Sequence, residues 1–485
     1  MKHRKTSCKK SLIRMLAVLL AVTAPGIGHG ASTWYVDANN GNDLWDGTTA
    51  TRDEGADTGP KKTLAAITAC TKPYDTVYAA PGYYSNNTVT VDGRLYRVCV
   101  TNYASLIATS SPKDTFIVGA ETADATQGDA YGNGPGAISG VYLYKNSTLQ
   151  GFTVTGGRTP LGSVEANCGG GVCGIASAFV KDCVISNNAA GYRGAGVCGV
   201  PASSGINKGP SVYRCLFANN AAANTTGHTV WNLTSIDNCI FSSSSSGYQA
   251  YQCKSVRNCT FVGSGTHIRN STAYNCLMLQ NDGAQNVLTN CFYTGTLASN
   301  SSCDSASRQI TADQAELDEH WIPAKTSVIV DAGDASYYTN AERNDVYGGQ
   351  RVYNGKIDVG AVEYDWRGDF GVLLDPVKGR AEVVSAGENV TTNIVSGILV
   401  PGGQAVEIDY SPKCNTSCHF TAVPAAGGSV DARNGDIVLS PDLEGQYTYS
   451  GKVGRNRVLI SYSGSGEASV FNFFDDGPGL CVIIK

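Results

Sequence analysis

A six-residue pattern of apolar and polar positions recurs along the middle of the chain. Each copy reads apolar, variable, Asn-like, Cys, apolar, large apolar, as at residues 256–261 (VRNCTF). Apolar positions spaced at 3.6 residues are scarce, so the pattern predicts short strands and not helices. Six copies lie at residues 180–185, 212–217, 236–241, 256–261, 273–278 and 288–293, and an earlier copy at 149–154 has Gly and Phe in the third and fourth positions.

The distance between successive copies falls along the chain, from 31 and 32 residues to 24, 20, 17 and 15. A helical solenoid keeps its period, whereas a coil of strands tolerates loops of changing length between its rungs. The third position is Gly, Asp, Arg or Asn, where we expect a left-handed backbone at a bend. The first, fourth and sixth positions then face inward. The pattern predicts a right-handed parallel β-helix with coils about 4.8 Å apart.

The cysteines fit this interior. The chain has 17 of them, and six occupy the fourth, inward position. An exported protein with this many cysteines would usually have a disulfide framework, but a column of inward cysteines favours a core ladder of buried thiols. No Cys-x-x-Cys or His-rich cluster supports zinc. Three candidate disulfide pairs remain open, Cys70 with Cys99, Cys173 with Cys198, and Cys414 with Cys418.

The first 30 residues predict export. Six Lys and Arg side chains precede a short apolar core at 16–24, and small residues follow near Ala31, as in a secretory signal peptide. We therefore expect an extracellular or cell-surface protein. Removal of residues 1–30 leaves 30 Lys and Arg against 41 Asp and Glu, a net charge of −11. This charge argues against a nucleic-acid partner, and no later segment is long enough to span a membrane.

The chain divides into two predicted domains after the signal peptide. Residues 31–365 form the β-helix, with a short helix over 61–67 as the plug of its first coil. Residues 366–485 contain short strands between Gly and Pro turns, which predicts a small β-sandwich. Its function is either that of a spacer or that of a glycan-binding module. Its clearest predicted strands cover 405–410, 419–423, 457–462 and 468–474.

Several segments resemble known surface proteins. Residues 35–84 resemble the opening of bacterial pectate-lyase-like β-helix proteins. The Asn-Cys-x-Phe rungs, with the Gly-rich segments 169–172 and 194–197, are similar to repeats of polymorphic outer-membrane proteins and other β-helix adhesins. Residues 328–364, including the run 357–364 (IDVGAVEY), resemble the choice-of-anchor Q domain that closes many surface β-helix proteins. The resemblance implies the fold and a surface location, but it spans lyases, hydrolases and adhesins.

Carbohydrate chemistry on such a fold requires charged groups on outward positions. β-Helix lyases hold Ca²⁺ with clustered carboxylates and use Lys or Arg as the base, and hydrolases use two carboxylates. Asp237 and Arg257 occupy the same outward position on adjacent coils, where an acid and a base could meet, although a surface ion pair is the simpler interpretation. Arg193 and His267 are the other catalytic candidates.

The densest acidic set lies near the end of the predicted β-helix, around Arg351. A Ca²⁺ site is one interpretation, and a hydrogen-bonded, salt-bridged turn is the other. No other cofactor is expected. The candidate metal ligands are Asp331, Asp345, Asp358 and Glu363.

Outward aromatic residues suggest contact with sugars. The preferred interpretation is an exported surface or secreted β-helix protein that acts in adhesion or glycan contact without catalysis, with a polysaccharide or cell-surface glycan as its partner. The alternative is a polysaccharide lyase or glycoside hydrolase acting on acidic polysaccharides. The candidate glycan contacts are Tyr213, Tyr248, Tyr251 and Tyr274.

The fifth position of the repeat should face outward, yet most of its residues are apolar. An apolar stripe on a solenoid normally meets a partner. We expect the C-terminal domain or a loop to cover it, in preference to an external ligand. The stripe consists of Thr153, Val184, Leu216, Ile240, Thr260, Leu277 and Phe292.

Overall fold

The computed structural model describes most of the chain between residues 31 and 475. The first 30 residues, where the signal peptide is predicted, lie outside the described part, as do residues 476–485. The internal gaps are 54, 56, 163–166, 200–208, 224–227, 243–246, 264, 280–283, 319, 339–343, 348–350, 353–355, 365–379, 387–397, 402, 412–415, 425–427, 435–436, 442–445, 452–456, 464 and 466.

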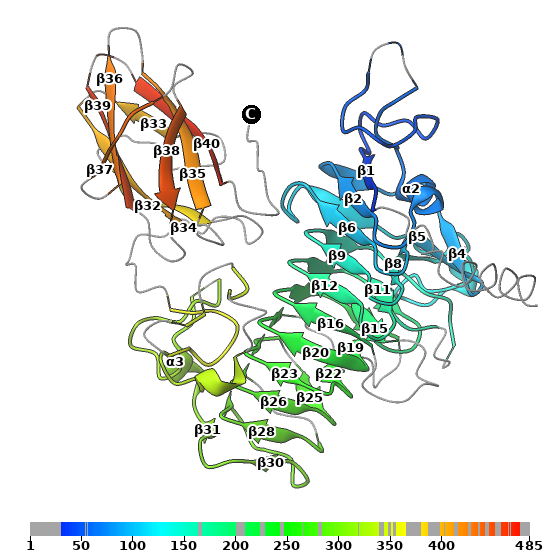
Figure 1. The fold of residues 1–485 in the computed structure, drawn as a ribbon. Helices are drawn as coiled ribbons and strands as arrows, with labels where there is room; N and C mark the ends of the chain where they lie inside the picture. The colour runs from blue at the N-terminus through cyan, green and yellow to red at the C-terminus, as the bar shows by residue number, and fades with distance from the viewer. Residues whose placement is uncertain are drawn as a thin grey trace, which may run out of the picture.

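Three sheets wind into a parallel β-helix (Figure 1). Sheet A contains β1 (Thr33–Val36), β2 (Thr76–Ala79), β6 (Ser105–Ala108), β9 (Thr148–Gln150), β12 (Phe179–Lys181), β16 (Gly209–Tyr213), β20 (Leu233–Asp237), β23 (Val256–Arg257), β26 (Thr272–Tyr274), β28 (Val287–Thr289) and β30 (Ser302–Cys303). Sheet B contains β3 (Gly82–Tyr84), β7 (Thr115–Val118), β10 (Thr153–Thr155), β13 (Val184–Ser186), β17 (Leu216–Ala218), β21 (Ile240–Phe241), β24 (Thr260–Phe261), β27 (Leu277–Met278), β29 (Phe292–Tyr293) and β31 (Arg308–Gln309).

Sheet C forms the third side of the coils and is shorter than the other two sheets. It contains β4 (Val89–Val91), β5 (Arg94–Val100), β8 (Ile138–Leu143), β11 (Val172–Gly174), β15 (Val197–Gly199), β19 (His228–Trp231), β22 (Tyr248–Tyr251) and β25 (Thr266–Arg269). Its strands pair in parallel except for the β4–β5 hairpin. A small parallel pair, β14 (Ala189–Ala190) with β18 (Ala221–Ala222), completes the β-helix.

The bend between sheets A and B confirms the predicted rung. The third residue of each repeat has positive φ, where asparagine and glycine are favoured. Even Arg214 takes this conformation, so the bend geometry overrides its intrinsic preference. The sequence-based prediction of a right-handed parallel β-helix is confirmed. The φ values are 84° at Gly151, 52° at Asp182, 49° at Arg214, 53° at Asn238, 49° at Asn258, 50° at Asn275 and 49° at Asn290.

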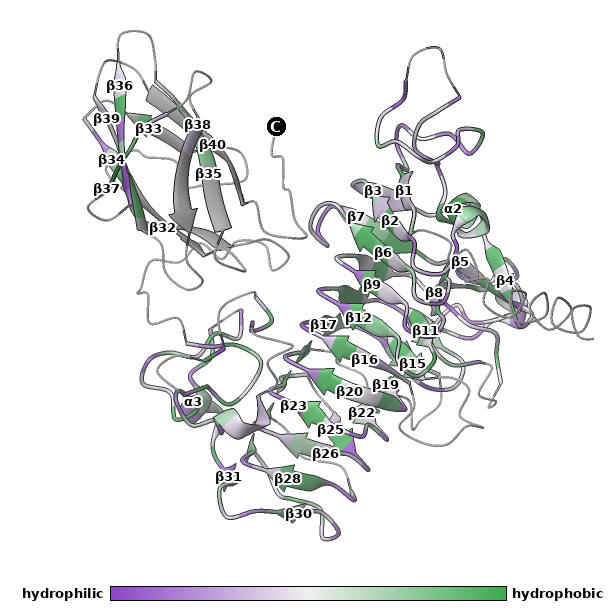
Figure 2. Cartoon of the chain, in the orientation of Figure 1, coloured by the Kyte–Doolittle hydropathy of each residue, from purple (hydrophilic) through white to green (hydrophobic). Residues whose placement is uncertain are grey.

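The interior consists of stacked columns of like side chains, as the pattern predicts. Phe241 lies between Phe217 and Phe261, with ring centroids 4.6 and 4.7 Å away. Figure 2 shows the resulting hydrophobic stripe across successive strands. The predicted cysteine ladder is also present as buried free thiols, so these sulfurs act as small apolar groups. The ladder consists of Cys183, Cys215, Cys239, Cys259, Cys276 and Cys291.

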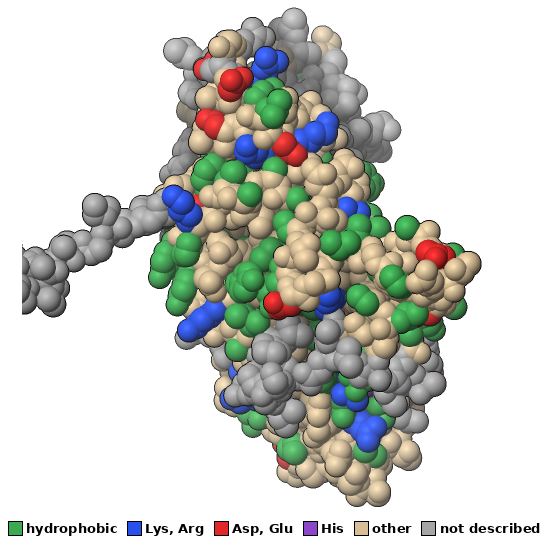
Figure 3. Space-filling view, turned by 90° about the vertical axis from the view of Figure 1, so that its right-hand side faces the viewer, with side chains coloured by type: hydrophobic (Ala, Val, Ile, Leu, Met, Phe, Trp, Pro, Cys, Tyr) green, Lys and Arg blue, Asp and Glu red, His purple; other side chains and the backbone are tan. Residues whose placement is uncertain are grey.

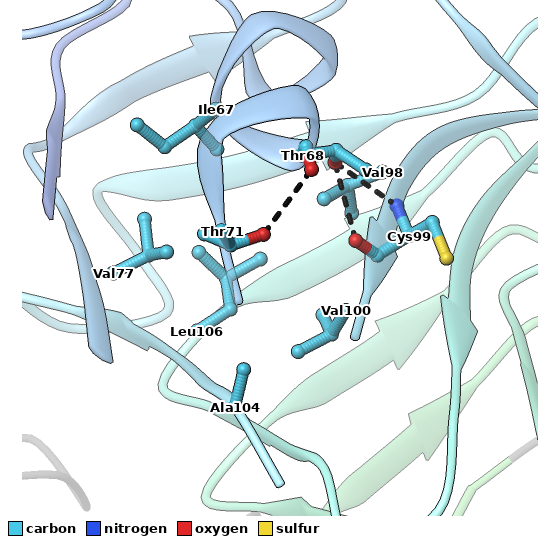
Figure 4. A pocket seen from close by; sticks show the side chains of 9 residues that line it. All are labelled: Ile67, Thr68, Thr71, Val77, Val98, Cys99, Val100, Ala104 and Leu106. Carbon is cyan, nitrogen blue, oxygen red and sulfur yellow. Dashed lines mark hydrogen bonds between the residues drawn. The ribbon is translucent and has the colours of Figure 1, made fainter. Parts of the chain in front are cut away.

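Helix α2 (Leu64–Cys70) covers the first coil, slightly later than predicted. Thr63 caps it by accepting a hydrogen bond from the Ala66 amide at 3.2 Å, and Leu64 and Ile67 are buried beneath it. Thr68 donates to the Cys99 carbonyl at 3.1 Å, which joins the helix to sheet C (Figure 4). The hollow below α2 is at most water-sized and almost wholly apolar, so it does not accommodate a sugar.

The described residues between 310 and 364, which we call the strap, lie along the outer face of sheet B. The strap includes α3 (Ala312–Ala315) and the 3₁₀ turn η4 (Ala335–Tyr337). It covers the later part of the apolar fifth column: Ile329 and Val359 pack with Leu277 and Phe292, and Val362 packs with Ile240. The prediction of coverage by a loop is therefore correct for this part of the column. The segment expected to close the helix runs along its side, and β30 and β31 are exposed.

Hydrogen bonds fix the strap to the bends of the β-helix. Ala361 donates its amide to the Thr260 hydroxyl at 2.8 Å, and Gly360 donates to the Asn275 carbonyl at 2.9 Å. Gly360 has φ +110°, and a Cβ there would lie 2.7 Å from the Thr260 hydroxyl. The close approach therefore requires glycine.

The C-terminal residues form two antiparallel sheets, which partly supports the predicted β-sandwich. One contains β32 (Arg380–Ala386), β34 (Ala405–Ser411), β39 (Arg457–Ser463), β36 (Ser429–Asn434) and β37 (Ile437–Leu439). The other contains β33 (Ile398–Pro401), β40 (Glu467–Asp475), β35 (Thr416–Val423) and β38 (Gln446–Gly451). Val406 and Ile460 from the first sheet and Phe420 from the second are buried. The predicted boundary at 365/366 falls outside the described residues.

Candidate functional site

Aromatic and arginine side chains gather on the outer face of sheet C. Adjacent strands place Cys198, Trp231, Tyr251 and Arg269 in one register column. Trp231 belongs to an apolar cluster separate from the interior, with Tyr192 and Tyr251 packed against it. Figure 3 shows this side of the molecule, where hydrophobic side chains and Lys or Arg side chains interleave. We call the following residues the arginine–tyrosine face: Tyr192, Arg193, Trp231, Tyr248, Tyr251 and Arg269.

Arg193 is the central cation of this face. Its guanidinium carbon lies 4.4 Å from the ring centroid of Tyr192, 5.3 Å from that of Trp231 and 5.6 Å from that of Tyr251. Among the described residues, no hydrogen-bond acceptor or carboxylate pairs with this guanidinium, and its Nε is buried without a partner. The three rings hold a charged group in place while leaving its donors available.

Arg269 supplies a second cation two strands further along the column from Trp231, about 10 Å away at the usual strand spacing. It donates to the Tyr248 hydroxyl at 2.6 Å and lies 5.1 Å above that ring. Trp231 donates its indole N–H to Gln252 at 2.8 Å, which fixes the ring on which Arg193 stacks. These contacts give the face a rigid arrangement of two cations among flat rings.

The structure brings together only two of the four tyrosines predicted as glycan contacts. Tyr248 and Tyr251 lie in the arginine–tyrosine face, 5.8 Å apart between ring centroids. Tyr213 lies on sheet A, stacked on Phe179 at 6.2 Å. Tyr274, also on sheet A, stacks on Tyr337 of the strap at 4.7 Å. These two side chains therefore contribute to packing on other faces.

The candidate acid and base form an ion pair. Arg257 Nε lies 2.6 Å from Asp237 Oδ1, and the two residues are register partners in β23 and β20. Burial raises the pKa of Asp237, and the Arg257 charge opposes this rise. Arg214 and Asp182 form a second pair at 2.6 Å, at the bends that follow β16 and β12 on earlier coils. Each pair joins two neighbouring coils, which indicates a stabilising role.

His267 lies in the interior and not on a face. It is fully buried, stacks on Phe261 at 5.5 Å between centroids, and its Nε2 lies 3.1 Å from the Gly263 carbonyl. Burial lowers the pKa of His267 to about 4. A neutral ring enclosed in the core does not reach a substrate.

Most of the acidic set near the end of the β-helix organises the strap. Arg351 is fully buried; it donates to the Gly360 carbonyl at 2.9 Å and pairs with Glu363 at 3.1 Å. Buried Asp358 accepts from the Asp331 amide at 2.7 Å, and Asp345 accepts from the Glu363 amide at 3.1 Å.

Asp331 is the exception, because its exposed carboxylate pairs with Lys356 at 3.0 Å. Among the described residues, no three His, Cys, Asp or Glu side chains are grouped so that they could hold a metal ion. The Ca²⁺ interpretation of this set stays a prediction.

Sequence reasoning missed Tyr192 and Trp231. The signal was present in two similar segments, 171–174 (GVCG) and 196–199 (GVCG), which supply β11 and β15 of sheet C. Aligning them with 229–231 and 249–251 recovers the register Val197–Val230–Ala250. Trp231 and Tyr251 then follow as the outward residues of that column.

The comparisons with known proteins give only distant likenesses. No family model matches the chain, and no curated protein matches it. Among solved structures, "Crystal structure of pectate lyase Pel9A" has 12% sequence identity and a TM-score of 0.41, and covers 69% of this chain and 98% of its own. "Rhamnogalacturonan lyase" has 16% identity and a TM-score of 0.34, covering 58% and 87%.

Likenesses at this level do not identify a reaction. The register of the strands themselves establishes the parallel β-helix. None of the helices in the described part of the chain is long and apolar enough to cross a membrane.

Proposed function

We propose that this chain is an exported β-helix protein that binds a carboxylate-bearing polysaccharide on the arginine–tyrosine face of sheet C. One observation carries the proposal: the guanidinium of Arg193 is stacked on three aromatic rings and has no acceptor among the described residues. The predicted leader at residues 1–30 supports a location where such polysaccharides are met.

The chemistry of the face suits an acidic sugar. A guanidinium donates two parallel hydrogen bonds to a carboxylate, and the nonpolar C–H face of a sugar ring packs on an aromatic ring. The stacking contacts already order Arg193, so binding loses less side-chain entropy than it would with a free arginine. Arg269, further along the same column, provides a second cation for the next acidic sugar of a chain.

The proposal predicts that binding depends on Arg193. Replacing Arg193 with Gln removes the charged donors but keeps a polar side chain, and should weaken binding of polygalacturonate or alginate oligosaccharides about 10- to 100-fold. This range corresponds to the roughly 1.5–3 kcal/mol of a charge-assisted hydrogen bond. Isothermal titration calorimetry with the purified chain measures the change.

Lys181→Gln is the matched control. Lys181 also lies over aromatic rings, those of Phe179 and Tyr213, but on sheet A. An equal loss in both variants, or no binding of acidic oligosaccharides by the unaltered chain, would contradict the proposal. Each titration is also followed by absorbance of unsaturated uronides, with and without Ca²⁺. Their appearance would replace the binding proposal with that of a lyase.

A further inference from the structure

Three cysteines form a cluster outside the ladder, next to the arginine–tyrosine face. Cys168, Cys173 and Cys198 are fully buried free thiols. Cys173 and Cys198 are register partners in the neighbouring parallel strands β11 and β15. The Cys173 sulfur lies 3.1 Å from the Cys168 carbonyl, and the Cys198 sulfur lies 3.6 Å from the Gly199 carbonyl.

A buried arginine lies against this cluster. Arg94 is 8% exposed, and one guanidinium nitrogen lies 2.9 Å from the Cys168 carbonyl and 3.5 Å from the Cys173 sulfur. Among the described residues, no carboxylate pairs with Arg94. Because a buried cation is costly without an anion, a thiolate at Cys173 is the nearest group that balances this charge. The hydrogen bond from Cys198, with the charge of Arg94, lowers the pKa of Cys173.

Two glycines allow the backbone to pack directly on the two cysteines. Gly169 has φ +73°, and a Cβ there would lie 2.4 Å from the Cys173 sulfur. Gly194 has φ +60°, and its Cβ would lie 3.0 Å from that of Cys198. Gly169 donates its amide to the Arg193 carbonyl at 3.1 Å, so the turns around the cluster also carry Arg193.

The ladder cysteines provide the contrast. Burial raises the pKa of Cys183, Cys239 and Cys259, whereas hydrogen bonds with Cys183 and Cys239 lower that of Cys215 to about 5. The contrast therefore lies in the cation: among the described residues, an arginine guanidinium is hydrogen-bonded to the Cys173 sulfur and to no sulfur of the ladder.

We propose that Cys173 and Cys198 are a redox pair that is converted to a disulfide by exchange with an external disulfide. The Cys173 thiolate attacks one sulfur of the reagent, forming a mixed disulfide and releasing one thiolate. Cys198 then loses its proton to solvent and attacks the Cys173 sulfur, releasing the second thiolate. Starting from the Cys173 thiolate and the Cys198 thiol, the pair loses one proton and two electrons, and the reagent is reduced to two thiolates, which take up protons from solvent.

The geometry allows this bond. Cα atoms of partners in neighbouring strands lie about 4.8 Å apart, within the range that a disulfide spans. Because the sulfurs are buried, exchange requires transient opening of the turn at 168–169, a local opening that does not need global unfolding. Cys168 is the third thiol and receives the bond from Cys198 when Cys173 is absent.

Peptide mapping tests the proposal without reference to any glycan. The purified full-length chain is incubated with glutathione disulfide or with dithiothreitol, then denatured in acid, alkylated and digested with trypsin. Cys168 and Cys173 fall in the peptide 159–181, and Cys198 falls in 194–208. We expect these peptides to be joined after oxidation, with the loss of two hydrogens, and Cys183 to be alkylated in both samples.

Variants identify the attacking sulfur. The joined peptides should persist in Cys168→Ser and Cys183→Ser, and should form at least about 10-fold more slowly in Cys173→Ser, because the arginine-stabilised thiolate is missing. Arg94→Lys keeps the charge and should retain exchange, whereas Arg94→Gln should slow it. Full alkylation of Cys173 and Cys198 after oxidation, or unchanged joining in Cys173→Ser, would overturn the proposal.

Discussion

Individual side chains in this β-helix take their properties from the side of the coil on which they lie. Arg193 is half-buried on aromatic rings and keeps its donors available, whereas His267 is enclosed between coils and neutral. Both residues have chemistry that suits an active site, so their types do not distinguish them. The distinction comes from burial, because desolvation favours the neutral form of an imidazole.

His267 should make stability depend on pH in the acidic range. The pKa of His267 is lowered from 6.5 to about 4 on folding, so below pH 6.5 the unfolded chain takes up a proton that the folded chain does not. The free energy of unfolding therefore falls as the pH drops from about 6.5 to about 4. The total loss from this group is about 3 kcal/mol.

The variant His267→Gln tests this assignment, because glutamine also occupies the neighbouring position Gln249 and does not titrate. Urea unfolding between pH 4 and 7 should show a shallower loss of stability than in the unaltered chain. His320→Gln makes the same substitution at an exposed position and serves as the matched control. Parallel curves for His267→Gln and the unaltered chain would contradict the assignment.

At the scale of elements, the strap is held by side chains of the bends. Asn275 donates to the Asp334 carbonyl at 2.9 Å and accepts from the Asp334 amide at 2.9 Å, and Asn290 donates to the Ala332 carbonyl at 3.0 Å. The asparagines therefore serve two functions. They permit the left-handed bend, and they bind the segment that covers sheet B.

Asn275→Gly should separate these two functions. Glycine keeps the positive φ but removes the side-chain hydrogen bonds, so the strap should loosen while the coils persist. Hydrogen exchange should become faster by about 10-fold or more in 329–334 and 357–362, corresponding to at least about 1.4 kcal/mol of lost local stability. Asn238→Gly makes the same exchange at a bend that, among the described residues, forms no hydrogen bond with the strap, and it should leave those amides protected.

Arg351 should be the residue on which the strap depends most. Replacement with Met leaves Glu363 buried and unpaired, which typically costs about 3–5 kcal/mol. Burial raises the pKa of Glu363 well above its usual range, and without the Arg351 charge it should rise further. The loss in free energy of unfolding caused by Arg351→Met should therefore become smaller as the pH falls and Glu363 takes up a proton.

Chemical denaturation at pH 7 and pH 5 measures this dependence. The exposed pair Lys356–Asp331 provides the control, since Lys356→Met should change stability by less than about 1 kcal/mol. Arg351→Met could instead lose the same free energy of unfolding at both pH values. That result would show that lost packing, and not the unpaired carboxylate, causes the destabilisation.

The sequence predicts the coils well and the strap poorly, for a physical reason. A rung depends on six consecutive residues, so its inward columns and its bend at Asn258 can be read locally. The strap contains few regular elements, and its contacts are distant: Ala361 and Thr260 are 101 residues apart. Its apolar target was visible in the fifth column, but the segment that covers it was not.

The candidate site lies between these extremes. Tyr248 and Tyr251 were predicted as outward aromatic residues, but so were Tyr213 and Tyr274, which the structure places on sheet A. The connections that lead into sheet C vary in length, so the register of its columns cannot be counted from the rungs alone. Arg193 precedes β15, and only the folded coil places it over the ring of Trp231.

At the scale of the whole molecule, the positive charge of the arginine–tyrosine face is opposite in sign to the net charge of the chain. Without residues 1–30 the chain has a net charge of −11, yet the arginine–tyrosine face offers two arginines to an anionic ligand. The distant charges act over the Debye length, about 30 Å at 0.01 M salt and about 10 Å at 0.1 M, while the contact pair is less screened.

The rate of association with polygalacturonate should therefore rise as salt increases from about 0.01 to 0.1 M, because the long-range repulsion is screened first. Surface plasmon resonance measures this rate. Arg193→Gln should dissociate faster but keep the same salt trend. A rate that falls steadily with salt would instead indicate that the ligand is steered by net attraction.

The shrinking coils have a consequence for how this molecule can change over time. Coils of 32 and of 15 residues present the same inward columns, because the bend and its flanking strands fix the interior while the third side varies. An insertion on that side changes the loop of one coil and does not shift the register of the next coil. In evolution such a chain can therefore gain, lose or exchange outer loops while its core stays unchanged. The loops can change function independently of the residues that maintain the fold.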